Sequence, residues 1–538
     1  MKFIIAVGVA SLILSACNIK PKRNSAYYRN IGGEPSRLNP IGSSDGYTWA
    51  VRDYVYETLL DVDPDTYDWV PHLATEWNIS DDKTVFRYKL REGVKWHDGV
   101  EFTAEDVKFS FDILFQDKFN TVTTRAFFDG IKEVKIIDKY TVEFIAKDQS
   151  YKNFDVINGT LKIFPKHFYE QDLPKSYFNK HLLGTGPYKL EKYYRGSRVV
   201  LVRNDDWWGY KIPDQKAHNF EKIVLRFVSD NNVELEMFKK GAFDFIGMQP
   251  EVYVKKTKGE IWGKEVHKNK IQNKGAKGSS FIGWNMKHPI LKNRNVRKAL
   301  YHLINRPLMI EKFEYNYKYP AAGPIYHESP YHNPSIKPIE YDPKQALQIL
   351  KNEGWSDSDG DNILDKVIDG QKMKFSITIL EPWEGFLKYL TVFKEDAKKA
   401  GVEINIKLIE WNSFIKLLDE RKFEAVRLAW GGTVTWDPMQ IWHSKSIENG
   451  GSNFVSFSNP RVDEITDKAK YIHDKEERIK LLQEAEKLIV NDYPYAWFFY
   501  SKFSFYGNSD RIKKEKDTYG YTVGQEYWKF KSEMRKDI

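Results

Sequence analysis

The sequence contains almost no cysteine. Of its 538 residues only Cys17 is a cysteine. An intramolecular disulfide is therefore excluded, and an exported domain of this size must be stable through its hydrophobic core alone. Long hydrophobic runs are missing too, because the longest apolar stretch, residues 3–14, is too short to cross a bilayer. No repeat of fixed period is present, so a solenoid or propeller is not indicated.

A concentrated charge of one sign is also missing. The net charge is +8, but 83 Lys and Arg residues are dispersed among 75 Asp and Glu residues. A nucleic-acid partner is therefore not predicted. The chain has no G-x-S-x-G, H-E-x-x-H or P-loop motif, which argues against an enzyme and against a required cofactor. A glycoside or peptide hydrolase with an unrecognised site is the competing hypothesis.

The amino terminus has the layout of a secretory signal. Lys2 precedes the apolar stretch, which ends in Leu14-Ser15-Ala16-Cys17. These four residues resemble the bacterial lipobox, which implies a signal peptide at 1–16, lipidation of Cys17 and a polar tether at 17–26. The protein would then be membrane-anchored in the cell envelope, facing the periplasm or the cell exterior. The alternative is a simple signal peptide with a chance cysteine.

Local patterns predict a mixed α/β fold of two or three domains. Residues 86–90, 140–144 and 402–409 alternate apolar and polar side chains, as half-buried strands do. Residues 101–115 read as a helix that Thr103 caps, with Asp106 completing a capping box. Residues 478–491 form a second amphipathic pattern that ends before Pro494.

Several motifs occur in a fixed order along the chain. They are RLNP at 37–40, VYETLL at 55–60, HLATEW at 72–77, FRYKLREGVKWHDG at 86–99, FTAEDV at 102–107, GTGPY at 184–188 with Trp207-Trp208, and NVRKAL at 295–300. This series resembles the dipeptide and oligopeptide class of bacterial extracellular solute-binding proteins, over nearly the whole mature chain.

The resemblance implies a two-lobed periplasmic-binding-protein fold with an extra domain, in which hinge strands join the lobes. We expect lobe I at 27–60, 183–280 and 505–538, the extra domain at 61–182 and lobe II at 281–504. Such proteins close over a ligand by a hinge motion.

The implied function is that of a substrate-binding lipoprotein of an ABC importer. It would capture a peptide or peptide-like solute and deliver it to the permease subunits, acting as a monomer. Members of this class also take oligosaccharides, opines or metal chelates, and a ligand sensor is a further alternative.

The ligand site is expected around residues 428–433. Peptide-binding relatives place an aspartate three residues after the tryptophan of this motif, where it pairs with the ligand's ammonium group. This chain has Thr433 at that position. Since a buried ammonium needs a strongly polar partner, Asp437 and Asp45 are candidate substitutes. The alternative for Asp437 is a turn residue before Pro438.

The motif positions place further residues at the ligand. Gly431 and Gly432 would let backbone approach it closely, or form a tight turn. Asn285 is expected at a hinge crossing, where it would bind ligand or satisfy backbone groups. The remaining candidates are Trp430, Trp411, Trp436, Tyr47 and Ser44.

A second motif carries acidic residues at alternate positions. Asp357, Asp359, Asp361 and Asp365 occupy positions one, three, five and nine of a calcium-loop pattern. The pattern is incomplete, because Asn362 replaces the usual glycine and Ile368 replaces the usual glutamate. The motif has two interpretations, a loop that binds a structural calcium ion and a plain surface turn.

Overall fold

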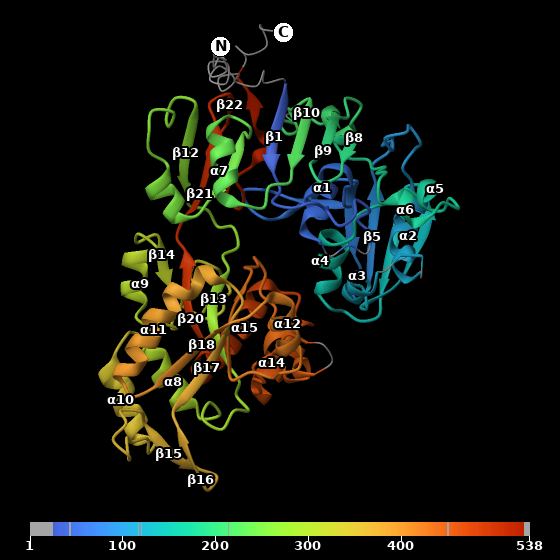
Figure 1. The fold of residues 1–538 in the computed structure, drawn as a ribbon. Helices are drawn as coiled ribbons and strands as arrows, with labels where there is room; N and C mark the ends of the chain where they lie inside the picture. Colours follow the sequence, from blue (N-terminus) through green and yellow to red (C-terminus); the bar gives the residue numbers. More distant parts are fainter. Residues whose placement is uncertain are drawn as a thin grey trace, which may run out of the picture.

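The computed structural model describes residues 25–531 except 42, 44, 117, 120, 214, 449 and 450. Figure 1 shows two bodies, one above the other, with a third set of elements beside the upper body. Strands and helices mix throughout, which confirms the predicted α/β class. The predictions for Cys17, the signal peptide and Ser44 lie outside the described residues.

The upper body, called lobe I here, is built on a seven-stranded sheet. Its strand order is β12-β21-β11-β1-β10-β9-β8. The bounds are β1 Ala26–Asn30, β8 Tyr188–Tyr194, β9 Arg198–Arg203, β10 Lys222–Arg226, β11 Phe245–Met248, β12 Val266–Ile271 and β21 Ser504–Ser509. Three separate parts of the chain therefore meet in one sheet.

The lower body, called lobe II here, is built on a six-stranded sheet. Its order is β14-β20-β13-β19-β17-β18. The bounds are β13 Ser279–Trp284, β14 Lys318–Pro320, β17 Ser376–Glu381, β18 Glu403–Leu408, β19 Ala425–Trp430 and β20 Tyr495–Ser501. All of these strands come from one continuous stretch of sequence.

The elements beside lobe I, called the extra domain here, contain a four-stranded antiparallel sheet. Its order is β4-β5-β7-β6, with β4 Ala74–Ile79, β5 Val85–Leu90, β6 Ile131–Asp138 and β7 Thr141–Ala146. Three two-stranded ribbons complete the strands: β2 Leu60–Val62 with β3 Trp69–Pro71, β15 Asp365–Ile368 with β16 Gln371–Lys374, and β22 Ile512–Lys513 with β23 Lys529–Phe530.

The helices flank these sheets (Figure 1). The α-helices are α1 Gly46–Val55, α2 Ala104–Asp112, α3 Val122–Phe127, α4 Lys152–Gly159, α5 Lys166–Tyr169, α6 Lys175–Phe178, α7 Asn231–Lys239, α8 Arg294–His302, α9 Arg306–Phe313, α10 Pro343–Asn352, α11 Leu387–Lys399, α12 Trp411–Asp419, α13 Met439–Trp442, α14 Pro460–Ala469 and α15 Lys475–Asp492. Short 3-10 turns are η1 Ile113–Phe115, η2 Trp208–Lys211, η4 Glu384–Phe386, η5 Ser444–Ile447 and η6 Gln525–Tyr527, and a π turn is η3 Val252–Lys256.

Local signals in the sequence place two helices well. In α2 the predicted capping box is present, and the Thr103 backbone N–H donates to Asp106 at 3.0 Å. The helix begins at Ala104, later than predicted, because Thr103 is extended and serves as the cap. The predicted helix at 478–491 is α15, which ends where Tyr493 adopts a left-handed conformation.

Each body has its own hydrophobic core. The largest cluster lies wholly in lobe II, a second fills the extra domain, and a third fills lobe I. Helix α2 and the η1 turn after it join the last two, because Val107 and Phe111 pack in the extra-domain cluster while Phe109 and Ile113 pack in the lobe I cluster. The extra domain is therefore packed on lobe I, whereas lobe II has a separate interior.

The chain crosses between the two large sheets twice. Residues 272–278 lead from β12 in lobe I to β13 in lobe II, and residues 502–503 lead from β20 back to β21. These two short segments are the backbone connections between lobe I and lobe II among the described residues.

Candidate functional site

In lobe II, the carboxyl ends of three strands lie at the edge of the sheet that faces lobe I. Strand β17 is parallel to both β18 and β19. Strand β13 is antiparallel to β19, with Ser279 opposite Trp430. Because β13 starts directly after the crossing at 272–278, the carboxyl end of β19 lies at that crossing. Ligands of open α/β sheets bind outside such carboxyl ends.

Lobe I presents the same kind of edge from the other side. Strands β1, β10 and β11 are parallel. Strand β11 pairs with β21, with Met248 opposite Phe505, and β21 begins right after the crossing at 502–503. The carboxyl ends of β1, β10 and β11 therefore face lobe II. We call the space between the two edges the seam.

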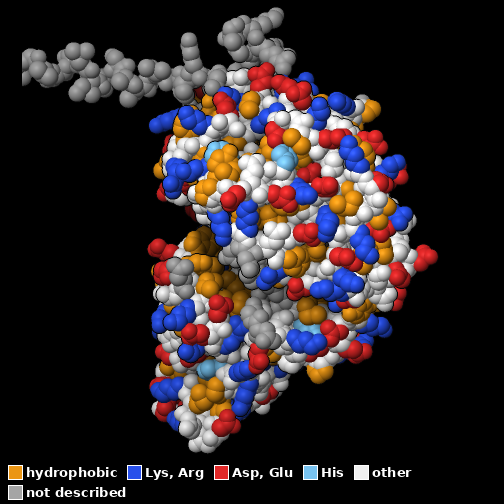
Figure 2. Space-filling view, turned by 90° about the vertical axis from the view of Figure 1, so that its right-hand side faces the viewer, with side chains coloured by type: hydrophobic (Ala, Val, Ile, Leu, Met, Phe, Trp, Pro, Cys, Tyr) orange, Lys and Arg blue, Asp and Glu red, His pale blue; other side chains and the backbone are white. Residues whose placement is uncertain are grey.

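The surface is hollowed between the two bodies. Figure 2 shows a notch there, with hydrophobic side chains exposed on its wall. Exposed aromatic residues lie on both edges. Trp383 after β17 is 60% exposed, Trp411 after β18 is 52% exposed, and Tyr47 of lobe I is 43% exposed. Such rings can stack on a solute or pack around its apolar groups.

Trp430 is half-buried and forms part of the wall of lobe II. Its ring stacks on Phe454 with centroids 6.0 Å apart and on Phe281 at 6.3 Å. Its indole N–H donates to the Tyr495 hydroxyl at 3.3 Å. The ring is therefore held by its own lobe, and only part of its surface is available to a ligand.

The residues after Trp430 are exposed. Gly431 has no heavy atom within 4 Å of the place a Cβ would take, so its backbone is open. Gly432 differs, because a Cβ there would lie 2.4 Å from the Lys277 backbone. Its lack of a side chain serves the close approach of the crossing segment. Thr433 is exposed beside them.

The two aspartates considered as ammonium partners are both engaged within the protein. Asp45 caps α1: its carboxylate accepts from the backbone N–H of Tyr47 at 2.9 Å and of Ser36 at 2.8 Å. Burial alone would raise the pKa of Asp45. The hydrogen bonds from Ser36, Tyr47 and Thr48 outweigh burial, so the pKa is lowered. Asp437 accepts from the Met439 N–H at 3.0 Å and forms an ion pair with Lys152.

Trp411 and Tyr47 stand where a ligand could reach them. Trp411 is the first residue of α12 and stacks on Phe414 with centroids 5.7 Å apart. Tyr47 covers Gly33, which follows β1, since a Cβ on Gly33 would lie 2.5 Å from the ring. The two rings therefore come from opposite edges of the seam.

One predicted ligand residue is more buried than expected, and the hinge placement predicted for another is wrong. Trp436 is only 8% exposed and belongs to the lobe II core, because its apolar ring packs into the interior. Asn285 lies after the end of β13 that is remote from the crossing, so it is not at a hinge. Its amide donates to the Phe423 carbonyl at 2.7 Å, which is the backbone-satisfying role.

Trp383 is the seam residue that sequence reasoning missed. It follows Glu381, whose buried carboxylate accepts from Arg427 Nε at 2.7 Å and from the Trp383 backbone N–H at 2.7 Å. The Arg427 guanidinium lies 5.8 Å from the Trp383 ring centre. A buried ion pair thus positions this ring. The available signal was its place directly after a strand-like run.

A large cavity lies away from the seam. It has a volume of about 890 Å³ and opens between the sheet of lobe I, the β2–β3 ribbon and residues 521–527. Its wall includes Glu57, which accepts from the indole N–H groups of Trp207 and Trp208 at 2.9 Å each. Among the described residues, none of those predicted to bind the ligand lines it.

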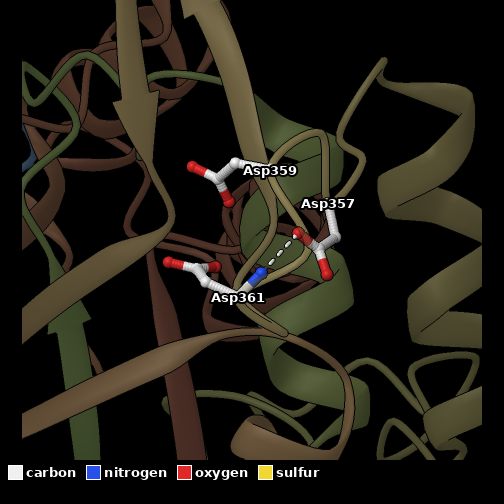
Figure 3. Close-up of side chains that lie close together, drawn as sticks. All are labelled: Asp357, Asp359 and Asp361. Atoms are coloured by element: carbon white, nitrogen blue, oxygen red, sulfur yellow. Dashed lines mark hydrogen bonds between the residues drawn. The ribbon is translucent and has the colours of Figure 1, made fainter.

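The acidic loop brings three carboxylates together. Oxygens of Asp357, Asp359 and Asp361 lie within 4.8 Å of one another (Figure 3). Asp365 is outside this group and accepts from Ser358 Oγ at 2.7 Å. Two lysines of the following ribbon face the loop: Lys372 pairs with Asp359 at 3.1 Å, and Lys374 pairs with Asp361.

Among residues 25–531, apart from the undescribed positions, no helix is both long and apolar enough to cross a membrane.

Two lobes with facing carboxyl edges, joined by two short crossings, define the class of two-lobed solute-binding proteins. Residues 68–453 match the family described as bacterial extracellular solute-binding proteins, family 5. The chain belongs to this family.

Curated relatives are similar to this chain over most of its length. Oligopeptide-binding protein AppA of Bacillus subtilis is 26% identical over 518 residues, which cover 91% of each chain. A putative ABC transporter peptide-binding protein of Brucella ovis is 27% identical over 462 residues, covering 81% of this chain and 80% of the relative.

Solved structures share the fold. AppA from Bacillus subtilis in complex with a nonapeptide has a TM-score of 0.75 and 24% identity, covering 94% of this chain and 99% of that one. NikA from Brucella suis in complex with Fe(III)-EDTA has a TM-score of 0.78 and 20% identity, covering 94% and 100%.

Proposed function

We propose that this protein is the substrate-binding component of an ABC importer. It captures a peptide or peptide-like solute in the seam and delivers it to the membrane permease. The proposal rests on one observation: the two sheet edges face each other across the seam. One edge has the exposed rings of Trp383 and Trp411, and the other has the exposed ring of Tyr47. The relatives named for oligopeptide or peptide binding point to the same cargo class.

Capture is reversible and breaks no covalent bond. A micromolar solute supplies about 8 kcal/mol of binding free energy, of which the part specific to the closed form drives closure. The hinge residues are those of the crossings at 272–278 and 502–503. Their positions support lobe boundaries near 280 and 504. The bounds 61–182 for the extra domain stay a prediction.

The cargo is recognised without a carboxylate at position 433. Asp45 and Asp437 already bond groups of the protein, which makes each a poorer partner for an ammonium group. We therefore propose that backbone groups near Gly431 and the exposed rings hold the solute, and that a free amino terminus is not required. A metal chelate is the second candidate cargo, because the structurally similar NikA was solved in complex with Fe(III)-EDTA.

The protein acts as a lipid-anchored monomer at the outer face of a membrane. This part of the proposal rests on the lipobox-like residues that end in Cys17 and on the polar tether after it.

The direct test is native mass spectrometry of the purified protein after incubation with a tryptic digest of casein. Retained peptides of unchanged mass support capture. A protein that retains none of them, or that shortens them, contradicts it. Acetylated and unacetylated copies of a retained peptide should bind alike. Small-angle scattering of the saturated protein should show a smaller radius of gyration than without peptide.

A further inference from the structure

The extra domain touches lobe II directly, although the two are not joined by adjacent sequence. Figure 1 shows the crossings on the left of the seam and α4 of the extra domain on the right, beside the helices of lobe II. The contact is made by residues 148–152, which we call the clamp segment, at the start of α4. It therefore bridges the seam at the end away from the hinge.

Charged and polar contacts dominate this bridge. Asp148 pairs with Lys470 at 2.7 Å, and the Tyr151 backbone N–H donates to the Lys470 carbonyl at 3.1 Å. His473 Nε2 lies 2.7 Å from the Gln149 carbonyl oxygen. Lys470 and His473 lie directly after α14 in lobe II, so the clamp segment contacts one short stretch of the chain there.

A second set of contacts reaches α15 and the segment after Trp430. The Arg478 guanidinium lies 3.9 Å from the centre of the Tyr151 ring. Lys152 pairs with Asp437, seven residues beyond Trp430. Burial raises the pKa of Tyr151, and the nearby Asp437 carboxylate adds to this. Asp437 thus belongs to a contact between domains, and we expect other groups to bind the solute.

These contacts are strong enough to orient the bodies and weak enough to open. The side chains of both ion pairs are 30–41% exposed, and such pairs stabilise little individually and are screened by salt. Burial alone would raise the pKa of Asp148, but the ion pair with Lys470, together with hydrogen bonds, outweighs burial and the pKa is lowered. Arg478, by contrast, is buried, so one contact of the set is shielded from solvent.

We propose that the clamp segment is a positioning element of the solute site: Asp148, Tyr151 and Lys152 hold lobe II against the extra domain and fix the segment that contains Asp437. The family fold supplies the hinge, and the clamp supplies a second, reversible attachment at the opposite end. Its role in solute retention rests on the function proposed above.

The test measures the distance between the two bodies in solute-free protein. Cysteines replace the exposed Lys132 of the extra domain and Lys398 of lobe II in the full chain with Cys17→Ser, and pulsed electron paramagnetic resonance reads the spin-label distance. The double variant Lys152→Met with Asp148→Asn should give a longer and broader distribution. Raising salt from about 50 mM to about 500 mM should do the same to the parent protein.

Two controls keep the result specific. Lys372→Met removes an exposed ion pair in the β15–β16 ribbon of lobe II and should leave the distribution unchanged. The charge exchange Lys152→Asp with Asp437→Lys should return the distribution of Lys152→Asp toward that of the parent protein. An unchanged distribution in the double variant, or an equal change in Lys372→Met, overturns the clamp.

Measuring the retention of casein peptides distinguishes failure of the clamp proposal from failure of the proposed function. After dilution, the double variant should lose peptides about 2- to 10-fold faster than the parent protein, as weak ion pairs allow. Equal loss rates overturn the role in retention. If the parent protein retains no peptide, the proposed function fails, while the distance measurement still decides whether the clamp exists.

Discussion

At the scale of single residues, the tryptophans of the motif region differ in role although they lie close in sequence. Trp436 is a core residue, Trp430 is a half-buried wall residue, and Trp411 is an exposed ring at a helix start. Their surroundings, and not their aromatic character, decide which of them can meet a solute.

This difference predicts opposite effects of truncation. Trp436→Ala should lower the free energy of unfolding by about 3–5 kcal/mol, because it leaves a cavity in the core. Trp411→Ala should change it by less than about 1 kcal/mol but weaken binding of a retained peptide. Urea unfolding and titration calorimetry measure the two quantities. Equal affinity in Trp411→Ala and the parent protein would remove this ring from the site.

Asp45 makes a prediction about pH. Its folded-state pKa is lowered, so its contribution to stability is present above the unfolded pKa of about 3.9 and is lost as pH falls through the folded value. Asp45→Ala should cost about 0.5–2 kcal/mol at pH 7 through loss of the helix cap.

Asp45→Asn is the matched control, because asparagine also caps helices but carries no charge. The stability difference between the parent protein and Asp45→Asn, from urea midpoints, should shrink as pH falls from 7 toward 3. A difference that stays constant over this range would show that the charge of Asp45 contributes nothing.

At the scale of elements, the acidic loop shows how neighbours alter a motif. Lys372 and Lys374 of the adjoining ribbon already neutralise Asp359 and Asp361. Calcium binding stays a prediction. Calcium should raise the midpoint of thermal unfolding relative to a chelator, and Asp357→Asn should abolish the rise. An identical midpoint with calcium and chelator would identify the loop as a surface turn held by its lysines.

The elements predicted from sequence differ in how well their ends are placed. Helix α2 was predictable because Thr103 and Asp106 satisfy its first backbone N–H groups locally. Strand β5 was predictable because its side chains alternate between the core and solvent. The placement of Asn285 was not, because only strand pairing shows which end of β13 meets the crossing.

At the scale of the whole molecule, separate cores and short crossings predict separable unfolding. The core of lobe II lies wholly within lobe II, whereas α2 contributes to the cores of both lobe I and the extra domain. Differential scanning calorimetry of the solute-free protein should show two transitions. A retained peptide should raise both, because it contacts both lobes. A single transition without peptide would mean that the lobes are coupled more tightly than two crossings and an exposed clamp allow.

The sequence by itself determined the class of fold, the order of the family motifs and several element ends, because these follow from local periodicity, capping and motif spacing. The tertiary structure decided which polar groups remain available to a solute. Asp437 and Asp45 look alike in sequence as free carboxylates, but Lys152 lies 285 positions from the first, and backbone N–H groups surround the second. Pairing between distant residues depends on how the bodies pack, which no local pattern encodes.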